Sequence, residues 1–249
     1  MAYLTIPGAD FSASPNRLRT AVIDPDGNYL SKIPSLVTWF RADDVKSSGG
    51  LGDWKDRKGL LKLTPDSAPV NPIVATVGGP KAVVFDGTKR LRGPASLQLL
   101  NNFTLIYVLQ PSAGFGDGML SGGFHSSGNG LQVYMLGNGA FQGQVRAGQA
   151  GSLAGVFAAS VSVIAAMSWD GTTLRFSKNG GAPTSIVPTT PGATVATTEL
   201  LIGAYYGQNF TRMSLFDLMQ FNVDLLGNSN QALDYSRVIA RMKARYGIA

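Results

Sequence analysis

The sequence predicts an all-β protein: one two-sheet antiparallel β-sandwich with a single helix near its C-terminal end. Hydrophobic residues make up 44% of the 249 residues and charged residues only 14%, which is enough apolar side chain for a large folded core. The 31 glycines and 13 prolines separate short apolar runs, a pattern typical of many turns. A chain of this length commonly forms one β domain, so we expect one sandwich.

The first strand is expected at residues 35–42, which are rich in β-branched and aromatic side chains. Residues 170 and 171, Asp-Gly, predict a tight two-residue hairpin turn between two apolar runs. The glycine-rich stretches 114–118 and 122–130 are interpreted as loops. Further strands, each bounded by Gly, Pro, Asn or Asp, are expected at 60–63, 81–85, 103–109, 131–135, 140–145, 156–169, 173–177, 200–204 and 213–223.

Helical periodicity is confined to the C-terminal region. An apolar stripe at spacings of three and four residues comprises Tyr235, Val238, Ile239, Met242 and Tyr246. Gly247 stands where a left-handed helix terminator is expected, so the helix should cover about residues 230–246. We expect this helix to clamp one edge or end of the sandwich. Trp39, Trp54 and Trp169 are expected in or beside the core.

The N-terminal region differs from the rest of the chain. Residues 1–33 show little periodicity and contain Pro7, Pro15 and Pro25, so we expect an extended arm followed by a sandwich over 34–249. The start lacks the pattern of a secretory signal peptide, and no apolar stretch is long enough to span a bilayer. The net charge of +6 comes from scattered basic residues, which does not favour a nucleic-acid partner. No cysteine is present, so disulfides are excluded.

Six phrases in order resemble the concanavalin A-like, laminin-G-like jelly-roll modules. They are residues 36–43, 52–57, 81–87, 167–180, 201–203 and 244–248. The resemblance covers about residues 34–249 and implies two facing antiparallel sheets with a final helix. Members of this superfamily include lectins, glycan-binding modules, glycosidases, and adhesion or virion proteins, so the fold alone does not assign an activity.

The acidic residues do not form a glycosidase pattern. Glucanases of this superfamily place several acidic residues alternately on one strand, whereas Glu199 is the single glutamate here. Asp217 is the most strand-like aspartate, and we expect it to be a turn or solvent-facing residue. His125 is the single histidine, and no Gly-x-Ser-x-Gly motif or thiol is present. We therefore expect no catalytic residues and no enzyme, unless a groove brings two aspartates about 5–10 Å apart.

No metal or cofactor motif stands out. Residues 24–28 alternate oxygen-bearing side chains like the start of a calcium loop, but Tyr29 stands where that loop needs glycine. We interpret this segment as a turn and expect no cofactor and no metal site. The resemblance leaves open a calcium ion held by aspartates and backbone carbonyls.

Polar and aromatic residues gather in one predicted loop, which is the pattern that favours sugar binding because rings stack on the apolar faces of sugars. The loop residues are Tyr205, Tyr206, Gln208, Asn209 and Phe210. A second loop, with Phe124, His125 and Asn129, is expected at the same end of the sandwich. These eight residues are the predicted ligand-binding set.

The preferred hypothesis is a non-enzymatic structural protein of a bacteriophage virion: a capsid decoration, head-fibre or tail-associated subunit. Two observations motivate it: the arm is too polar and too interrupted by prolines to fold alone, and the sandwich carries no catalytic set. The resemblance to modules of phage virion proteins points the same way. Residues 1–33 would dock on other virion subunits, for example by adding a strand to a sheet edge, and the chain would form a homo-oligomer. The alternative is a carbohydrate-binding module that recognises host-surface glycans. The two roles are compatible.

Overall fold

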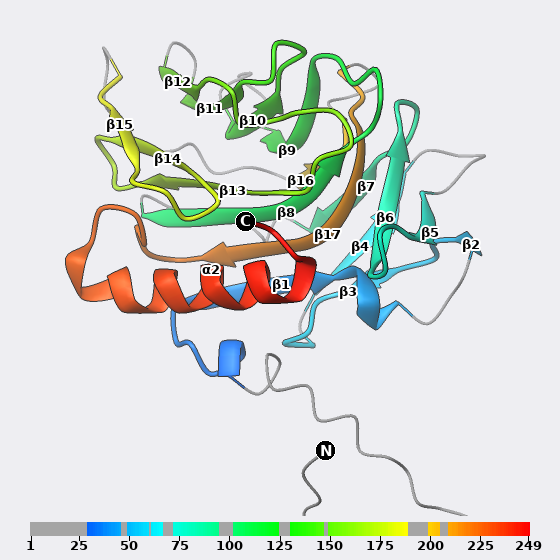
Figure 1. Cartoon of the computed structure of the whole chain (residues 1–249), viewed down its shortest axis with the longest axis horizontal. Helices are drawn as coiled ribbons and strands as arrows, with labels where there is room; N and C mark the ends of the chain where they lie inside the picture. The colour runs from blue at the N-terminus through cyan, green and yellow to red at the C-terminus, as the bar shows by residue number, and fades with distance from the viewer. Residues whose placement is uncertain are drawn as a thin grey trace, which may run out of the picture.

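The computed structural model describes residues 29–45, 49–59, 61–66, 72–94, 102–124, 130–146, 149–188, 199–204 and 209–249. Two antiparallel sheets pack face to face, and one long helix lies outside them (Figure 1). The predicted fold class is therefore confirmed. One sheet has nine strands in the order β15-β14-β13-β8-β17-β6-β5-β2, with β1 also paired to β17, and the other has eight in the order β12-β11-β10-β9-β16-β7-β4-β3.

The strands of the nine-stranded sheet are β1 (Leu36–Arg41), β2 (Gly49–Gly50), β5 (Ile73–Thr76), β6 (Lys81–Asp86), β8 (Phe103–Pro111), β13 (Val163–Trp169), β14 (Leu174–Lys178), β15 (Thr184–Ile186) and β17 (Arg212–Phe221). The eight-stranded sheet contains β3 (Trp54–Lys55), β4 (Lys62–Pro65), β7 (Leu91–Pro94), β9 (Gly118–Phe124), β10 (Gln132–Met135), β11 (Phe141–Arg146), β12 (Gln149–Leu153) and β16 (Glu199–Ile202). The helical elements are η1 (Ala42–Asp44), η3 (Ser229–Gln231) and α2 (Ala232–Tyr246).

The central strands bury both of their faces. In β8, Leu105 and Tyr107 belong to the core between the sheets, whereas Ile106 and Val108 belong to a second apolar cluster with α2. Successive side chains of a strand point to opposite faces, so one apolar run serves both layers. The three tryptophans are fully buried, as predicted: Trp54 and Trp169 lie between the sheets and Trp39 lies on the helix side.

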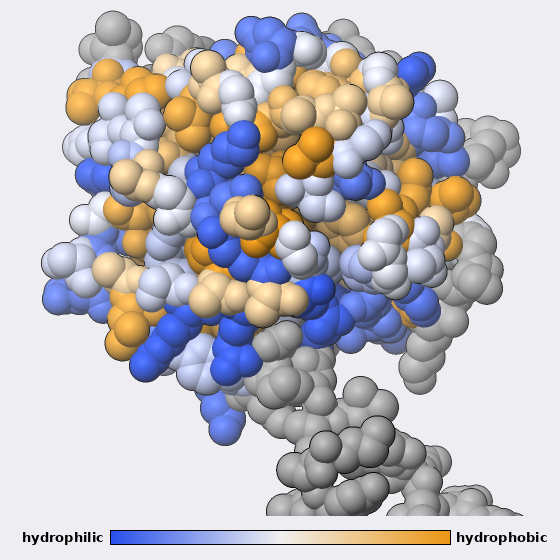
Figure 2. Space-filling view, viewed as in Figure 1, coloured by the Kyte–Doolittle hydropathy of each residue, from blue (hydrophilic) through white to orange (hydrophobic). Residues whose placement is uncertain are grey.

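Helix α2 covers the outer face of the nine-stranded sheet (Figure 1), so the prediction that it clamps an edge or end is wrong. Val238, Ile239 and Met242 are buried against β8, β13 and β17, which carry outward apolar residues that must be covered. The helix ends at Gly247, whose φ of 63° is the predicted left-handed terminator. In Figure 2, hydrophilic residues are frequent on the lower part of the same view, where α2 lies.

The last residues of the expected arm pack on the body. Leu30 is fully buried and Ile33 is 4% exposed in the α2 cluster, and Tyr29 and Leu30 form a helical turn, not extended chain. The Arg241 guanidinium lies 4.5 Å from the centroid of the Tyr29 ring, which is cation–π distance. Residues 1–28 lie outside the described residues.

β9, which was not predicted, runs from Gly118 to Phe124 and so includes one end of each glycine-rich stretch that was predicted as a loop. A Cβ at Gly118 would lie 2.6 Å from Thr211 Cα, and one at Gly122 would lie 2.6 Å from Met119 Sδ. These glycines therefore permit close packing and do not interrupt the strand. The strand predicted at 156–169 begins only at Val163. In the part of the chain described, no helix is both long enough and apolar enough to cross a membrane.

Candidate functional site

Two polar hollows lie at opposite ends of β17. The first, the Phe210 groove, has a volume of about 510 Å³ and is lined by Gly87, Gly114, Gly116, Asp117, Asn209, Phe210 and Arg212. The second, the Asp224 pocket, has a volume of about 570 Å³ and is lined by Asn102, Asp170, Thr172, Asn222, Val223, Asp224, Gly227, Asn228 and Ser229. Both are open and polar, so each is a candidate for a hydrogen-bonding ligand.

The segment before β17 is hydrogen-bonded to β9 and to the residue that follows β16. Met119 N–H donates to Asn209 O at 2.9 Å, and Thr211 N–H donates to Gly203 O at 2.8 Å. Asn209 has a φ of 53°, a left-handed conformation that asparagine tolerates better than most residues. Its main chain is therefore fixed, and Phe210 is presented from a defined position.

The Phe210 ring is half-buried and does not belong to either apolar cluster. The nearby Phe115, by contrast, packs against the core between the sheets. Asn209 and Asp117 are exposed, and Asp117 Oδ1 accepts a 2.7 Å hydrogen bond from Gly137 N–H. The groove thus combines an aromatic ring, an amide, a carboxylate and the Arg212 guanidinium.

The structure separates the two predicted binding loops. β9 and β16 are antiparallel, with Phe124 opposite Glu199 and Ser121 opposite Ile202. The loop with Asn209 follows the Ile202 end, whereas the loop after Phe124 leaves from the Glu199 end. The prediction that they share one end is therefore wrong.

Of the eight predicted binding residues, Asn209 and Phe210 line the groove. For Phe124 the structure describes the main chain as the last residue of β9. Tyr205, Tyr206, Gln208, His125 and Asn129 lie outside the described residues.

At the other end of β17, Asp170 shapes the hairpin between β13 and β14. Trp169 pairs with Leu174, so the loop spans residues 170–173 and is longer than the predicted two-residue turn. Asp170 Oδ1 accepts from Thr172 N–H at 2.8 Å and from Thr173 N–H at 2.7 Å. The carboxylate thus supplies acceptors for the loop amides, as aspartates do in Asx turns.

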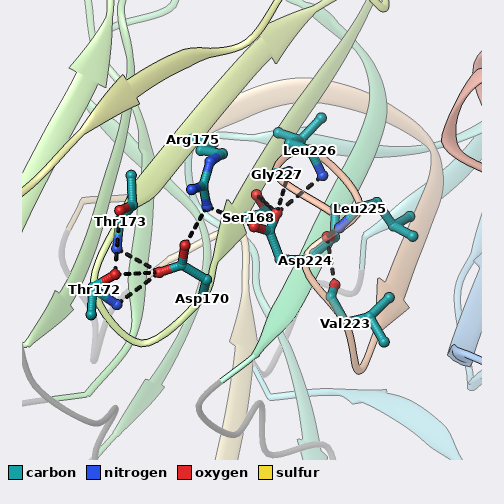
Figure 3. Close-up of polar contacts among 11 residues, drawn as sticks. Ser168, Asp170, Thr172, Thr173, Arg175, Val223, Asp224, Leu225, Leu226 and Gly227 are labelled. Atoms are coloured by element: carbon teal, nitrogen blue, oxygen red, sulfur yellow. Dashed lines mark hydrogen bonds and ion pairs between the residues drawn. The ribbon is translucent and has the colours of Figure 1, made fainter. Parts of the chain in front are cut away.

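Asp224 organises the chain after β17 in the same way (Figure 3). Its Oδ1 accepts from the Ser168 hydroxyl at 2.5 Å, from Leu226 N–H at 3.0 Å and from Gly227 N–H at 2.9 Å. One guanidinium nitrogen of Arg175 then joins the two loops, at 2.7 Å from Asp170 Oδ2 and 2.6 Å from Asp224 Oδ2. All four carboxylate oxygens therefore have partners within the chain.

The charge state of Asp170 follows from these contacts. Burial by itself raises its pKa, but the hydrogen bonds from Arg175, Thr172 and Thr173 outweigh burial and lower the pKa to about 2. Asp170 is therefore ionised at neutral pH. A glycosidase needs one protonated carboxyl beside the scissile bond, and Asp170 does not meet that need.

Asp217 lies far from the predicted solvent-facing position. It is fully buried in β17 and accepts hydrogen bonds from Trp39 Nε1–H at 2.6 Å and from the Tyr246 hydroxyl. A register shift between Leu215 and Asp217 in the pairing of β17 with β8 marks a β-bulge. The bulge places Phe216 and Asp217 together on the α2 side, where both meet Tyr246.

Sequence reasoning missed Arg175 and Asp224 as site residues. The Asp-Gly pair indicated a turn at Asp170 but gave no sign that Arg175, on β14, would join Asp170 to Asp224 in a distant loop. Across the residues that the structure describes, no cluster of three or more His, Cys, Asp or Glu side chains is arranged to hold a metal ion.

No family model matches the sequence, and a search of curated proteins finds no match. Solved structures do match. Domain 4 of AbnA, a GH43 extracellular arabinanase from Geobacillus stearothermophilus in complex with arabinotriose, is 15% identical, with 81% of this chain and 98% of that chain covered and a TM-score of 0.59. The binding domain of botulinum neurotoxin serotype G is 10% identical, covers 84% of this chain and 51% of that chain, and has a TM-score of 0.63.

A Trypanosoma rangeli sialidase mutant displaying trans-sialidase activity is 14% identical, with 82% of this chain and 33% of that chain covered and a TM-score of 0.57. This chain therefore spans about half of the toxin chain and a third of the sialidase chain. At such identities the likeness shows the fold alone. The chain shares the β-sandwich fold of these proteins, and a jelly roll fits it.

Proposed function

We propose that this chain is a non-enzymatic binding protein that recognises a glycan in the Phe210 groove. The observation that carries the proposal is the gathering of the half-buried Phe210 ring, the exposed Asn209 amide and two charged side chains in one open groove. Sugars bind by stacking their apolar faces on rings while amides and charged groups bond their hydroxyls. The likeness to a domain whose structure holds arabinotriose supports this proposal by analogy.

The non-enzymatic part of the proposal is supported by the carboxylates. Asp170 and Asp224 share one nitrogen of Arg175 and hold the ends of two loops. Asp217 is enclosed between β17 and α2. Each of these aspartates thus has a structural task within the fold, which supports a non-enzymatic role.

The test is a glycan array followed by calorimetry on Phe210→Ala. We expect glycan affinity to fall by about tenfold or more, because stacking on a ring contributes on the order of 1–2 kcal/mol. The free energy of unfolding should change by less than about 1 kcal/mol, because the ring lies outside both apolar clusters.

Leu233→Ala is the matched control, because Leu233 is 58% exposed on α2 and lies outside the groove. Its affinity should equal that of the unchanged chain. Tyr206→Ala extends the test to the rest of the predicted loop. A blank array, or a Phe210→Ala chain with unchanged affinity, would refute the proposal.

The setting we propose is a virion, with residues 1–28 of the arm bound to a neighbouring subunit and the chain forming a homo-oligomer. Tyr29, Leu30 and Ile33 pack on the sandwich beside α2. A neighbouring subunit bound by the residues that precede Tyr29 would therefore be held near α2. Deleting residues 1–28 should leave the sandwich folded and abolish co-purification with phage particles. Truncated chains that assemble onto particles as well as full-length chains would refute this role.

A further inference from the structure

Arg212 is fixed at the rim of the Phe210 groove by its own strand. It is the first residue of β17, its side chain is exposed, and its carbonyl accepts a 3.0 Å hydrogen bond from Ser112 N–H. In the register of β17 with β6, Arg212 lies opposite Asp86. Its main chain is thus held from both sides while its guanidinium lines the groove.

The Arg212 side chain lies over Gly87. A Cβ at Gly87 would come within 2.7 Å of Arg212 Nε and 3.1 Å of Arg212 Cγ, so any larger residue would displace the arginine. Gly87 has a φ of 92°, which L side chains rarely adopt. The absence of a side chain at Gly87 therefore provides the space that the Arg212 side chain occupies.

The nearest carboxylate in the register already has other partners. Asp86 Oδ2 lies 2.7 Å from Lys89 Nζ, and its Oδ1 accepts from the Thr88 hydroxyl at 2.7 Å. Asp117, which also lines the groove, accepts a hydrogen bond from Gly137 N–H. Among the described residues, no ion pair within 4.0 Å joins Arg212 to a carboxylate.

We propose that the glycan bound in the Phe210 groove is an acidic sugar and that Arg212 binds its carboxylate. This inference rests on the proposed function. A guanidinium presents paired N–H donors that match the two oxygens of a carboxylate, and such charge-assisted pairs are stronger than neutral hydrogen bonds. Phe210 then takes the apolar face of the ring, and Asn209 and Asp117 bond its hydroxyls. The net charge of +6 favours the approach of an acidic polymer.

The experiment compares matched oligosaccharides by calorimetry: a uronic-acid oligomer and the same oligomer with its carboxyl groups reduced to neutral alcohols. The unchanged chain should bind the acidic form about tenfold more tightly at about 50 mM salt, and raising the salt should shrink this ratio. Arg212→Gln should reduce the ratio to about one, because it weakens binding of the acidic oligomer more than binding of the neutral one. Arg212→Lys should restore part of it, because lysine keeps the charge without the fork.

Lys55→Gln is the charge-matched control, because Lys55 is an exposed cation on β3 and lies outside the groove. It removes one positive charge and should leave the ratio unchanged. Equal binding of both oligomers by the unchanged chain, lost in Phe210→Ala, would overturn the acidic-sugar inference and leave glycan binding standing. Binding of neither oligomer, together with a blank glycan array, would overturn both.

Discussion

Arg175 and Asp224 are 49 positions apart in the sequence, yet a guanidinium nitrogen of Arg175 lies 2.6 Å from Asp224 Oδ2. The contact ties β14 to the chain that leaves β17 on its way to α2. Gly227 makes room for it, because a Cβ there would lie 2.4 Å from Arg175 Cζ. The same nitrogen also contacts Asp170, so Arg175 connects two residues that line the Asp224 pocket.

Replacing Arg175 by glutamine should destabilise the fold by about 1–3 kcal/mol, because a largely buried carboxylate oxygen loses its charged donor. The side chain of Asp224 is only 9% exposed, so water compensates poorly. Urea unfolding at neutral pH measures the change. Lys178→Gln, on the same strand but exposed, should cost less than about 0.5 kcal/mol. Equal losses of stability in the two variants would contradict a stabilising role for the contact between Arg175 and Asp224.

Calcium and a chelator should both leave the melting temperature unchanged. Arg175 already supplies the positive charge between Asp170 and Asp224, and a cation would have to displace it. A ligand that binds only the folded state raises the melting temperature once its concentration exceeds its dissociation constant, so differential scanning calorimetry with millimolar calcium is a direct measurement. A rise that a chelator reverses would show a metal site that this geometry does not predict.

The sequence predicted those elements whose signal is local. β8 is an apolar run bounded by turn residues, and α2 has a clean apolar stripe with a glycine terminator, so both were placed within a few residues. The end of β13 was predicted correctly, but its start was predicted at residue 156 and lies at Val163. β9 was missed because its glycines look like a loop. Gly118 is required by the close approach of Thr211, which is far away in the sequence, and Gly122 by the packing of the Met119 side chain on the same strand, which composition does not reveal.

In the candidate sites, too, the residues with a local sequence signal were predicted and those without one were missed. Asn209 and Phe210 were identified because a polar-aromatic loop has a recognisable composition. The error about Phe124 came from strand direction, since composition does not say at which end of a sheet a loop emerges. Arg175 and Asp224 have no local signature at all. Asp217 was misjudged because a bulge, which depends on pairing with β8, turns it toward α2.

Gly203→Ala should destabilise the protein much more than Gly155→Ala. Both glycines have positive φ, 89° and 65°, so both substitutions incur about 1–2 kcal/mol of backbone strain. A Cβ at Gly203 would also lie 2.4 Å from the fully buried Phe85 ring, whereas Gly155 has no heavy atom within 4 Å of that point. We expect an additional cost of about 1–3 kcal/mol for Gly203→Ala in urea unfolding. Equal costs would show that Phe85 can move aside.

The stability of the protein should fall as pH rises from about 4 to about 7, through Asp217. Burial raises the pKa of Asp217 from 3.8 to about 7, although the hydrogen bonds from Tyr246 and Trp39 and the charge of Arg41 favour the ionised form. Below the unfolded pKa both states are protonated and Asp217 contributes its full stability. Between the two values the unfolded chain releases its proton more readily than the folded one, so this stability is lost as pH rises through about 7.

Asp217→Asn isolates this effect, because the amide keeps an acceptor for Trp39 or Tyr246 and does not ionise. Relative to the variant, the unchanged chain should lose a few kcal/mol between about pH 4 and 7, since each pKa unit corresponds to about 1.4 kcal/mol. Asp53→Asn, at an exposed aspartate 3.4 Å from Lys62, should follow the unchanged chain closely. Urea unfolding across this range provides the comparison. Parallel profiles for the unchanged chain and Asp217→Asn would mean that the buried carboxyl keeps an ordinary pKa, with Arg41 balancing its burial.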